Sequence, residues 1–251
     1  TAKADYALTF LDEARQGDKP WFLYMAFNAP HAPLQVLKED YEKYEKLYEK
    51  GWDKIHAERI ARQEQLELFD YNIDEPGRPE HIPAWEELSE TQRNFEIRRG
   101  AAYAALVDRL DIEIRRVVEN IEQAGELDNT IILFLSDNGA CPYERPSRGR
   151  DLFPYEHASN WNDSTGWAWA RNAPFRMYKQ NQYEGGSSTP AILHWPAGLK
   201  AKAGSTDPTP VHIIDILPTI AAVTQTKIPS SWPQRDLTNF AGESFAPLLA
   251  G

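Results

Sequence analysis

The sequence contains a single cysteine and fewer positive than negative charges. The first observation excludes an internal disulfide, and the second argues against a nucleic-acid partner. Cys141 is the one cysteine among 251 residues, so no disulfide can form within the chain. Lys and Arg number 27 against 38 Asp and Glu, which gives a formal net charge of −11. Because nucleic-acid-binding proteins concentrate cationic side chains, this balance argues against a DNA or RNA partner.

Long apolar runs are also missing. No segment approaches the roughly 20 consecutive apolar residues of a membrane-spanning helix, so we expect no membrane partner. The 41% hydrophobic and 26% charged residues are typical of a globular protein. A chain of 251 residues can bury a sizeable core, as one large domain or two.

The first third of the chain shows alternating helix and strand patterns. Residues 2–16 place apolar side chains at helical spacing, and Gly17 follows where a helix would stop. Residues 21–27 (WFLYMAF) are apolar and rich in aromatic residues, which predicts a buried strand. Residues 37–69 are helical in composition, and residues 74–85 hold three prolines and a glycine, which predicts a loop.

A long helix is predicted after residue 89. Ser89 and Gln92 have the spacing of a capping box, in which each side chain bonds the other residue's backbone N–H. Apolar side chains then recur with the 3.6-residue period, and Gly125 marks the predicted end of this helix.

Two further strands are predicted at residues 130–135 and 189–195, with a helix near 215–223. The first of these strands is an almost uninterrupted apolar run, as in strands buried on both faces. Helix and strand alternate along the chain, which is the order of an α/β protein with a mostly parallel sheet flanked by helices.

The residues Asp137, Asn138 and Gly139 allow two interpretations. Asn-Gly is a strong hairpin signal, because both residues accept positive φ. A hairpin needs a second alternating strand at once, however, and residues 141–150 (CPYERPSRGR) do not form one. Ligands of open α/β sheets bind just beyond the carboxyl ends of strands, where Asp137 and Asn138 would offer two oxygen donors to a hard cation such as calcium.

Three ordered stretches carry a resemblance to a known family. They are APHAPLQ at residues 29–35, LSDNGA at 135–140, and APFRMYK at 173–179 followed by YEGG at 183–186. In this order and separation they resemble the type I sulfatases of the alkaline phosphatase superfamily, close to the arylsulfatases. The resemblance covers nearly the whole chain and implies a partial alkaline-phosphatase-like α/β domain.

The resemblance implies hydrolysis of a sulfate ester, aryl or carbohydrate, at a calcium ion with a formylglycine nucleophile. It assigns Asp137 and Asn138 to the calcium, and His31 and Lys179 to the sulfate as catalytic residues. We therefore expect these four residues to lie within a few ångströms of one another. Without the resemblance, His31 would be interpreted as a loop histidine and Lys179 as a surface lysine.

Three further features have structural interpretations. Gly185 and Gly186 let the backbone pass close to the site. Arg176 anchors its own loop, for instance through a salt bridge. His212 and Asp215 belong to a segment that we interpret as packing.

The chain departs from the family in what precedes Asp137. The family's formylglycine arises from a Cys/Ser-x-Pro/Ala-x-Arg motif in the amino-terminal part of the domain, next to further calcium ligands, and no such motif precedes Asp137 here. Cys141 and Arg145 have a similar spacing but follow the metal residues, so we interpret them as a coincidence. We expect residues 1–251 to be a carboxyl-terminal portion of the catalytic domain, truncated at both ends and inactive by itself.

Two alternatives to a sulfatase remain open. One is a phosphonate or phosphodiester hydrolase of the same superfamily, which shares the metal-binding Asp-Asn pair. The other is a non-catalytic carbohydrate-binding remnant, whose relevant segment is residues 151–169 with five aromatic side chains that could stack on sugars or pack onto the domain. The sequence leaves the oligomeric state open, and the resemblance favours a periplasmic or secreted protein.

Overall fold

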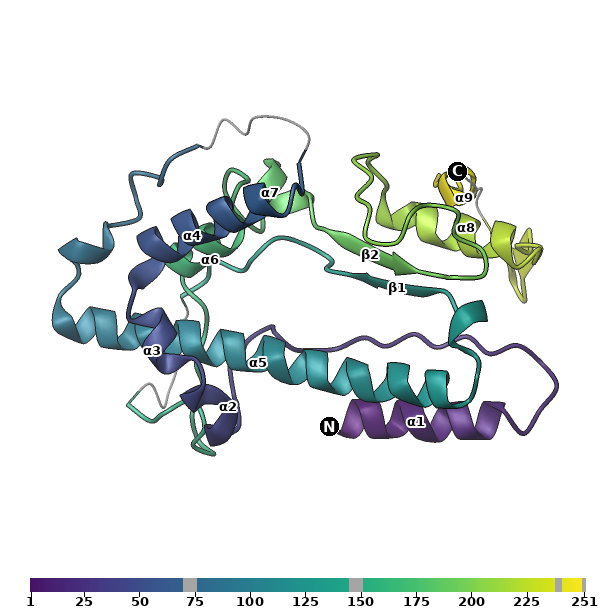
Figure 1. Cartoon of the computed structure of the whole chain (residues 1–251), viewed down its shortest axis with the longest axis horizontal. Coiled ribbons are helices and arrows are strands. Elements are labelled where there is room, and N and C mark those ends of the chain that lie inside the picture. The colour runs from purple at the N-terminus through teal and green to yellow at the C-terminus, as the bar shows by residue number, and fades with distance from the viewer. Residues whose placement is uncertain (70–75, 145–150, 238–240, 250–251) are drawn as a thin grey trace. The chain divides into compact units, whose positions relative to one another are not determined.

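The computed structural model describes residues 1–69, 76–144, 151–237 and 241–249 (Figure 1). These residues form two compact units. Unit 1 comprises residues 1–124 and 138–190, and unit 2 comprises residues 125–137 and 191–251. The boundary therefore falls between Asp137 and Asn138, and each unit is described by itself.

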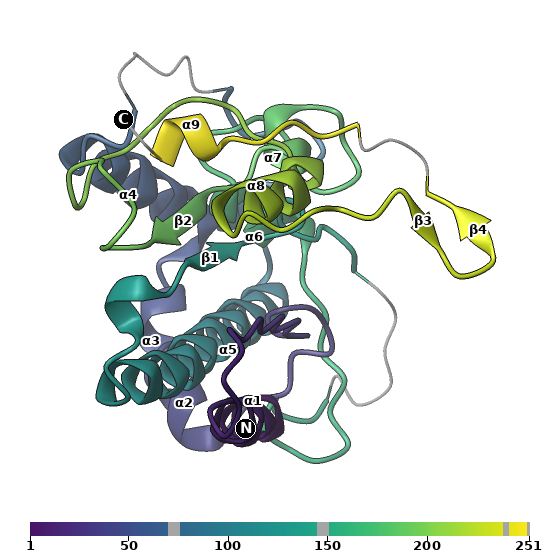
Figure 2. The same cartoon turned by 90° about the vertical axis from the view of Figure 1, so that its right-hand side faces the viewer.

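The first helix of unit 1, α1 (Ala2–Ala14), confirms the predicted helix at residues 2–16. Ala4, Ala7 and Leu11 are buried on one side, where α1 packs along α5 (Glu90–Gln123), as Figures 1 and 2 both show. Small side chains at this spacing let the two helices approach closely.

The helical composition of residues 37–69 is divided among three helices: α2 (Lys38–Glu42), α3 (Glu45–Tyr48) and α4 (Gly51–Gln65). Gly51 begins α4 with a φ of +76°, a conformation that favours glycine. A Cβ atom at this position would lie 2.3 Å from the Trp85 ring. The chain therefore turns at Gly51 and passes directly against a core tryptophan.

The predicted capping box starts α5. The Gln92 backbone N–H donates to Ser89 Oγ over 3.3 Å, and the Ser89 N–H donates to Gln92 Oε1 over 2.9 Å. The helix runs to Gln123, and Gly125 follows with a φ of +73°. Both predicted ends of this helix are confirmed.

The predicted buried strand at residues 21–27 is wrong. The segment has no regular secondary structure and pairs with no strand among the described residues. Its side chains alternate between partly buried and exposed, and Phe22 and Tyr24 are 73% and 81% exposed. An apolar run was interpreted as a strand covered on both faces, whereas one face of this segment is open.

The other two predicted strands exist in unit 2, but their relative direction was wrong. Strand β1 (Ile132–Leu135) pairs with β2 (Ala191–His194) in antiparallel register, with Ile132 opposite His194 and Leu135 opposite Ala191. Hydrophobic periodicity does not encode strand direction. The residues that separate the two strands in the sequence, 138–190, belong to unit 1.

The rest of unit 2 is made of short elements. They are η2 (Leu127–Asn129), η3 (Ile213–Asp215), α8 (Ile216–Val223), the hairpin of β3 (Ser231–Trp232) and β4 (Arg235–Asp236), and α9 (Ala246–Leu249). The predicted helix near 215–223 is thereby confirmed.

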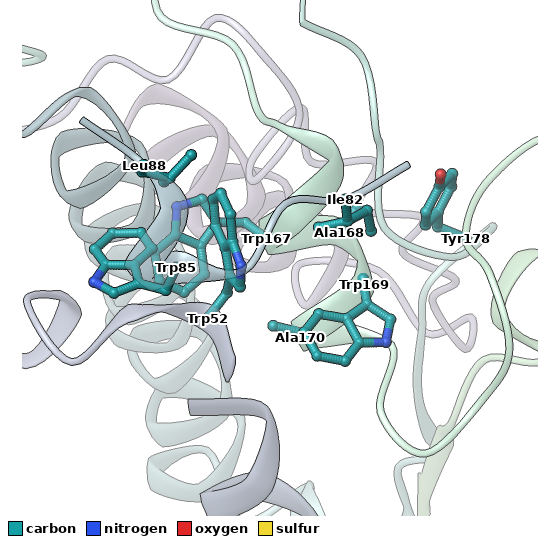
Figure 3. Close-up of a cluster of buried hydrophobic side chains, with 9 residues drawn as sticks. All are labelled: Trp52, Ile82, Trp85, Leu88, Trp167, Ala168, Trp169, Ala170 and Tyr178. Atoms are coloured by element: carbon teal, nitrogen blue, oxygen red, sulfur yellow. The ribbon is translucent and has the colours of Figure 1, made fainter. Parts of the chain in front are cut away.

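Unit 1 is completed by η1 (Trp85–Glu87), α6 (Thr165–Arg171) and α7 (Glu184–Ser187). Its main core gathers three tryptophans, Trp52, Trp85 and Trp167, whose rings meet edge to face or tilted at centroid distances of 5.0 to 5.9 Å (Figure 3). Such pairs stabilise beyond their buried area.

The aromatic segment at residues 151–169 supplies core side chains. Trp161, Trp167 and Trp169 are at most 5% exposed. Trp161 packs in a second cluster with Leu34 and Tyr41. Trp161, Trp167 and Trp169 therefore offer no exposed surface on which a sugar ring could stack. For these three side chains the sugar-stacking interpretation was wrong.

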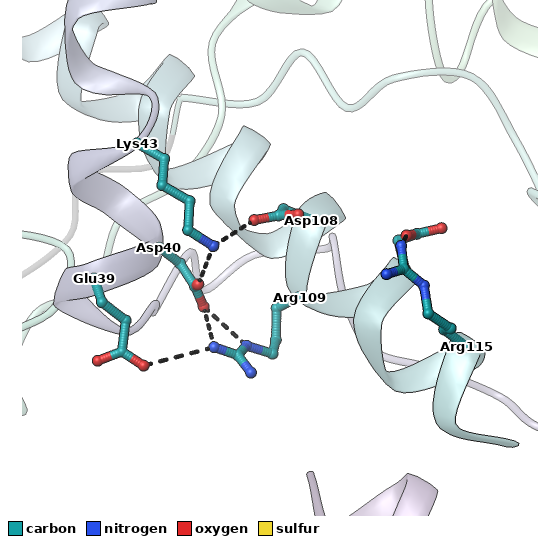
Figure 4. A network of polar contacts seen from close by, with 7 residues as sticks. Glu39, Asp40, Lys43, Asp108, Arg109 and Arg115 are labelled. Carbon is teal, nitrogen blue, oxygen red and sulfur yellow. Dashed lines mark hydrogen bonds and ion pairs between the residues drawn. The ribbon is translucent and has the colours of Figure 1, made fainter. Parts of the chain in front are cut away.

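A network of charged side chains joins α2 to α5 (Figure 4). Asp40, only 1% exposed, accepts from Lys43 Nζ at 2.9 Å and from both Nε and Nη2 of Arg109 at 2.8 and 2.7 Å. Burial alone would raise the pKa of Asp40, but the hydrogen bonds from Lys43 and Arg109 outweigh it and lower that pKa. Lys43 also pairs with Asp108 at 2.9 Å.

Replacing Asp40 with Asn is expected to lower the free energy of unfolding by about 1.5 to 3 kcal/mol, because two cations lose their shared acceptor. Asp111→Asn is the matched control, since Asp111 forms an exposed pair with Arg115 on α5, and it should stay within about 0.5 kcal/mol of the original protein. Urea denaturation measures both. Equal effects of the two substitutions would contradict a special role for the α2–α5 network.

Two buried titratable groups of unit 1 have pKa values shifted in opposite senses. His56 is 5% exposed and stacks on Trp169 at 4.0 Å. Burial, with the charge of Arg59, lowers its pKa from 6.5 to about 4, against a smaller opposing effect of Asp53. Glu96 is 8% exposed, and burial raises its pKa from 4.5 to about 7, although Arg99 and Ser164 favour its ionised form.

These shifts predict opposing pH dependences. Between pH 4 and 6.5 the unfolded chain binds a proton at His56 that the folded protein does not, so stability rises with pH. Between pH 4.5 and 7 the folded protein binds a proton at Glu96 that the unfolded chain does not, so stability falls with pH. Each contribution is at most about 3 kcal/mol.

We therefore expect His56→Phe to give a stability that falls as the pH is raised from 4.5 to 6.5, and Glu96→Gln to give one that rises. Denaturant unfolding at several pH values, compared with the unchanged protein, measures both slopes. Identical slopes in all three proteins would show that neither group is shifted as described.

Candidate functional site

Asn172 joins three segments of unit 1 that are distant in sequence. It follows α6 directly as the residue that caps its carboxyl end. Its Nδ2 donates to the carbonyls of Met177 and Gly185 over 3.0 and 2.7 Å, and its Oδ1 accepts from the Ala140 N–H over 3.0 Å. We call Asn172 and the segments that it joins, residues 139–140, 177–179 and 185–186, the Asn172 junction.

Main-chain hydrogen bonds complete the Asn172 junction. The Lys179 N–H donates to Ala140 O over 3.1 Å, and the Gly139 N–H donates to Gly186 O over 3.2 Å. The segment that carries Lys179 therefore lies directly against the residues that follow Asn138. Two of the three stretches on which the family resemblance rests are brought together by this part of the structure.

Close backbone approach explains the glycines of the Asn172 junction. A Cβ on Gly139 would lie 1.7 Å from Gly185 O, and a Cβ on Gly185 would lie 2.1 Å from Met177 O. The prediction that Gly185 and Gly186 let the backbone pass closely is confirmed. The hairpin interpretation of Gly139 was wrong, because its φ lies outside the left-handed region.

Lys179 sits in a strained turn. Met177 and Gln180, on either side of Tyr178 and Lys179, have φ values of 65° and 71°, which side chains rarely adopt. Such conformations cost on the order of 1 to 3 kcal/mol each and concentrate at functional sites. Lys179 is half-buried, and its Nζ has no hydrogen-bond or ion-pair partner in the part of the chain that the structure describes.

The four predicted site residues lie in different surroundings. Lys179 belongs to the Asn172 junction, and Asn138 immediately precedes the junction residue Gly139. Asp137 is exposed and belongs to unit 2, so its position is described only within that unit. His31 is exposed in a turn, where its N–H donates to Asn28 O over 2.8 Å and its Nδ1 lies 2.8 Å from Ala32 O. The proximity of all four residues stays a prediction.

Arg176, His212 and Asp215 have structural surroundings. Arg176 lies 4.2 Å above the Tyr183 ring, so it anchors its loop by a cation–π contact and not by a salt bridge among the described residues. His212 and Asp215 form a capping box at the start of η3, in which the His212 N–H donates to Asp215 Oδ2 over 2.8 Å. His212 is exposed and Asp215 partly exposed, so these residues cap η3, and the interpretation of the segment as packing is wrong for His212.

Sequence reasoning missed Asn172 and His81. Asn172 follows a short buried helix and shows no periodic signal, although its place before the Ala173-Pro174 turn is typical of a capping residue. His81 Nε2 lies 2.6 Å from the Tyr178 hydroxyl, and this contact joins residues 97 positions apart. No local pattern could have indicated it.

The donors for a metal ion are hard oxygens of the right kind but too few in number. Calcium takes six to eight oxygen ligands, whereas Asp137 and Asn138 offer two side chains. Among the described residues, no group of three or more His, Cys, Asp and Glu side chains could hold a metal ion. The described residues alone do not account for a calcium site.

The letters of the formylglycine motif occur once after Asp137, in Ser231-Trp232-Pro233-Gln234-Arg235, which the sequence reasoning had overlooked. In the structure this stretch forms the β3–β4 hairpin of unit 2. It follows the predicted metal residues, which is the reverse of the family's order, and we assign it no catalytic role.

Comparison with known proteins matches residues 1–226 to the family model described as Sulfatase. An uncharacterized sulfatase of Schizosaccharomyces pombe is 34% identical over 240 residues, which cover 89% of this chain and 43% of that protein. An arylsulfatase of Klebsiella aerogenes is 30% identical over 220 residues, or 83% of this chain and 47% of that protein. The chain thus spans less than half the length of these curated relatives.

The fold has counterparts among solved structures. The crystal structure of Ps i-CgsB in complex with k-i-k-neocarrahexaose superposes with a TM-score of 0.59 at 24% identity, covering 98% of this chain and 37% of that one. This likeness shows the alkaline-phosphatase-like fold of sulfatases. No helix of the described residues is long and apolar enough to cross a membrane. With a family match over residues 1–226 and relatives at 30% identity or more, the chain belongs to the sulfatase family.

Proposed function

We propose that the protein containing this chain hydrolyses sulfate esters, and that the Asn172 junction presents Lys179 to the sulfate group. The observation that carries this proposal is the pairing of the Lys179 N–H with Ala140 O, next to Asn138. This pairing supports a position of the lysine near Asn138, which precedes Ala140 by two residues. A half-buried ammonium group without a protein partner in the described residues is suited to receive an anion.

Charge development in the reaction supports the proposed roles. As the bond between sulfur and the bridging oxygen breaks, negative charge grows on that oxygen. A cation or a proton donor held nearby stabilises the transition state more than the bound ester. We assign the cationic role to Lys179 and a proton-donating or hydrogen-bonding role to His31, whose exposed ring is accessible to a substrate.

The proposal includes calcium and formylglycine, as the family implies, but this chain supplies only part of that site. Asp137 would contribute a charged oxygen and Asn138 a neutral one, and the remaining ligands and the nucleophile would come from residues outside this chain. We propose a periplasmic or secreted location on the same family basis. A sulfate ester is favoured over a phosphodiester because the matched relatives are sulfatases.

Lys179→Ala in the full-length enzyme should lower the turnover of 4-nitrophenyl sulfate by roughly a hundredfold or more, since losing one charge-stabilising contact costs about 3 to 4 kcal/mol. The melting temperature should change by less than about 2 °C, because the side chain has no partner among the described residues. Lys54→Ala, at an exposed position of α4, is the matched control and should alter neither quantity.

Both quantities are measured on one preparation, with bis(4-nitrophenyl) phosphate as a parallel substrate. Unchanged turnover in Lys179→Ala would remove this residue from the site. Faster hydrolysis of the phosphodiester than of the sulfate by the unchanged enzyme would favour the phosphodiesterase alternative.

Gly139→Ala should destabilise the Asn172 junction by about 1 to 3 kcal/mol, because its Cβ would overlap Gly185 O and overpacking of this kind forces the backbone apart. Gly77→Ala is the control, since nothing lies within 4 Å of a Cβ at that position. Urea unfolding should separate the two variants. Equal stabilities would mean that the close approach of Gly139 and Gly185 is not a real constraint.

A further inference from the structure

Tyr178 lies between two anchored residues of the turn that carries Lys179. In the Asn172 junction, hydrogen bonds hold the Met177 carbonyl and the Lys179 N–H. The Tyr178 side chain is only 6% exposed. It belongs to the tryptophan core, the buried cluster that also contains Trp52, Trp85 and Trp167 (Figure 3). A displacement of the Tyr178 ring would therefore be transmitted directly to the backbone of Lys179.

The Tyr178 hydroxyl is held by His81. The hydroxyl lies 2.6 Å from His81 Nε2, which is a normal hydrogen-bond distance, and the two rings meet edge to face at 81°. Burial raises the pKa of Tyr178, so the hydroxyl keeps its proton at neutral pH. No other hydrogen bond to this hydroxyl exists among the described residues. Because a buried hydroxyl without a partner is unfavourable, this contact constrains where the Tyr178 ring can lie.

The loop that carries His81 is itself fixed to α4. The Asp53 carboxylate, on α4, accepts from Arg78 Nε over 2.9 Å and from the Trp85 N–H over 2.8 Å. These two bonds hold the loop on both sides of His81. Arg78 also bonds the carbonyl of Ile82, which is 1% exposed in the tryptophan core. His81 therefore reaches Tyr178 from a fixed base.

We propose that His81 is a positioning residue, which holds the turn around Lys179 through the Tyr178 hydroxyl. The left-handed conformations of Met177 and Gln180 on either side cost free energy and persist only where the surroundings fix them. Loss of the His81 contact should therefore let Lys179 leave its place. The inference rests on the proposed function for the role of Lys179, whereas the effect of His81 on the turn does not depend on that role.

The kinetic test uses the full-length enzyme with 4-nitrophenyl sulfate. His81→Phe and Tyr178→Phe should each lower kcat about five- to tenfold and change KM less than about twofold, because a positioned cation acts mainly in the transition state. The double variant should be no slower than the slower single variant, since all three lack the same bond. His81→Gln keeps a polar group that can replace the ring nitrogen, so about half of kcat or more should remain. Glu80→Gln, at the exposed neighbouring position, is the matched control and should leave kcat unchanged.

A second measurement separates positioning from a general loss of folded enzyme. In a Lys179→Ala background, adding His81→Phe should lower kcat by less than about twofold, because the lysine on which His81 acts is absent. A general structural defect would still lower kcat about five- to tenfold there. Hydrogen exchange followed by mass spectrometry gives a readout without substrate: the Lys179 amide should exchange roughly tenfold faster in His81→Phe than in Glu80→Gln.

Three results would overturn the inference. They are an unchanged kcat in His81→Phe, an equally large fall in kcat after Lys179 has been removed, and an unchanged exchange rate of the Lys179 amide in His81→Phe. A loss of turnover in Lys179→Ala accompanied by any of these would refute the role of His81 and leave the proposed function intact. Unchanged turnover in Lys179→Ala would instead refute the proposed role of the lysine, and faster exchange in His81→Phe would identify this as the failed part.

Discussion

The candidate site depends on the three hydrogen bonds that the Asn172 side chain forms with the backbone. The Asn172 amide saturates two carbonyls and one N–H from three different segments, and the geometry requires both a donor and an acceptor on one short side chain. Aspartate would lose the two donated bonds, and an apolar residue would leave all three backbone groups unpaired. Each unpaired buried group costs about 1 to 3 kcal/mol. The turn with left-handed Met177 and Gln180 is held in place by these bonds.

Asn172 directly follows helix α6, and this helix has no exposed face. In α6, residues 166–170 are all buried, so the helix is enclosed instead of amphipathic. The Trp167 ring packs edge to face against the rings of Trp52 and Tyr48, and α6 packs on α4. Arg171 adds an ion pair with Asp163 and lies 3.6 Å above the Tyr103 ring. The tryptophan core therefore positions the end of α6, and through Asn172 it positions the turn around Lys179.

The sequence allowed good prediction where the determinants are local. The capping box at Ser89 and the helical spacing of α1 each depend on residues a few positions apart, and both are confirmed. The direction of β1 against β2 depends on the path of more than fifty intervening residues, and it was wrong. The burial of Trp161, Trp167 and Trp169 is also non-local, since aromatic density alone does not distinguish a core from a binding surface.

In the candidate site too, features with local determinants could be predicted from the sequence and features with non-local determinants could not. Gly185 and Gly186 suggested a close backbone approach, which the structure confirms. Asn172 and His81, in contrast, contact residues whose proximity only the fold creates. The buried pair of Glu96 and Arg99 could not be foreseen either, because (i, i+3) charge pairs on a helix are usually solvated. Burying such a pair rarely improves stability over apolar residues of the same size. Here the pair lines a cavity, and Arg99 Nε has no hydrogen-bond partner among the described residues, so the fold does not satisfy the guanidinium completely.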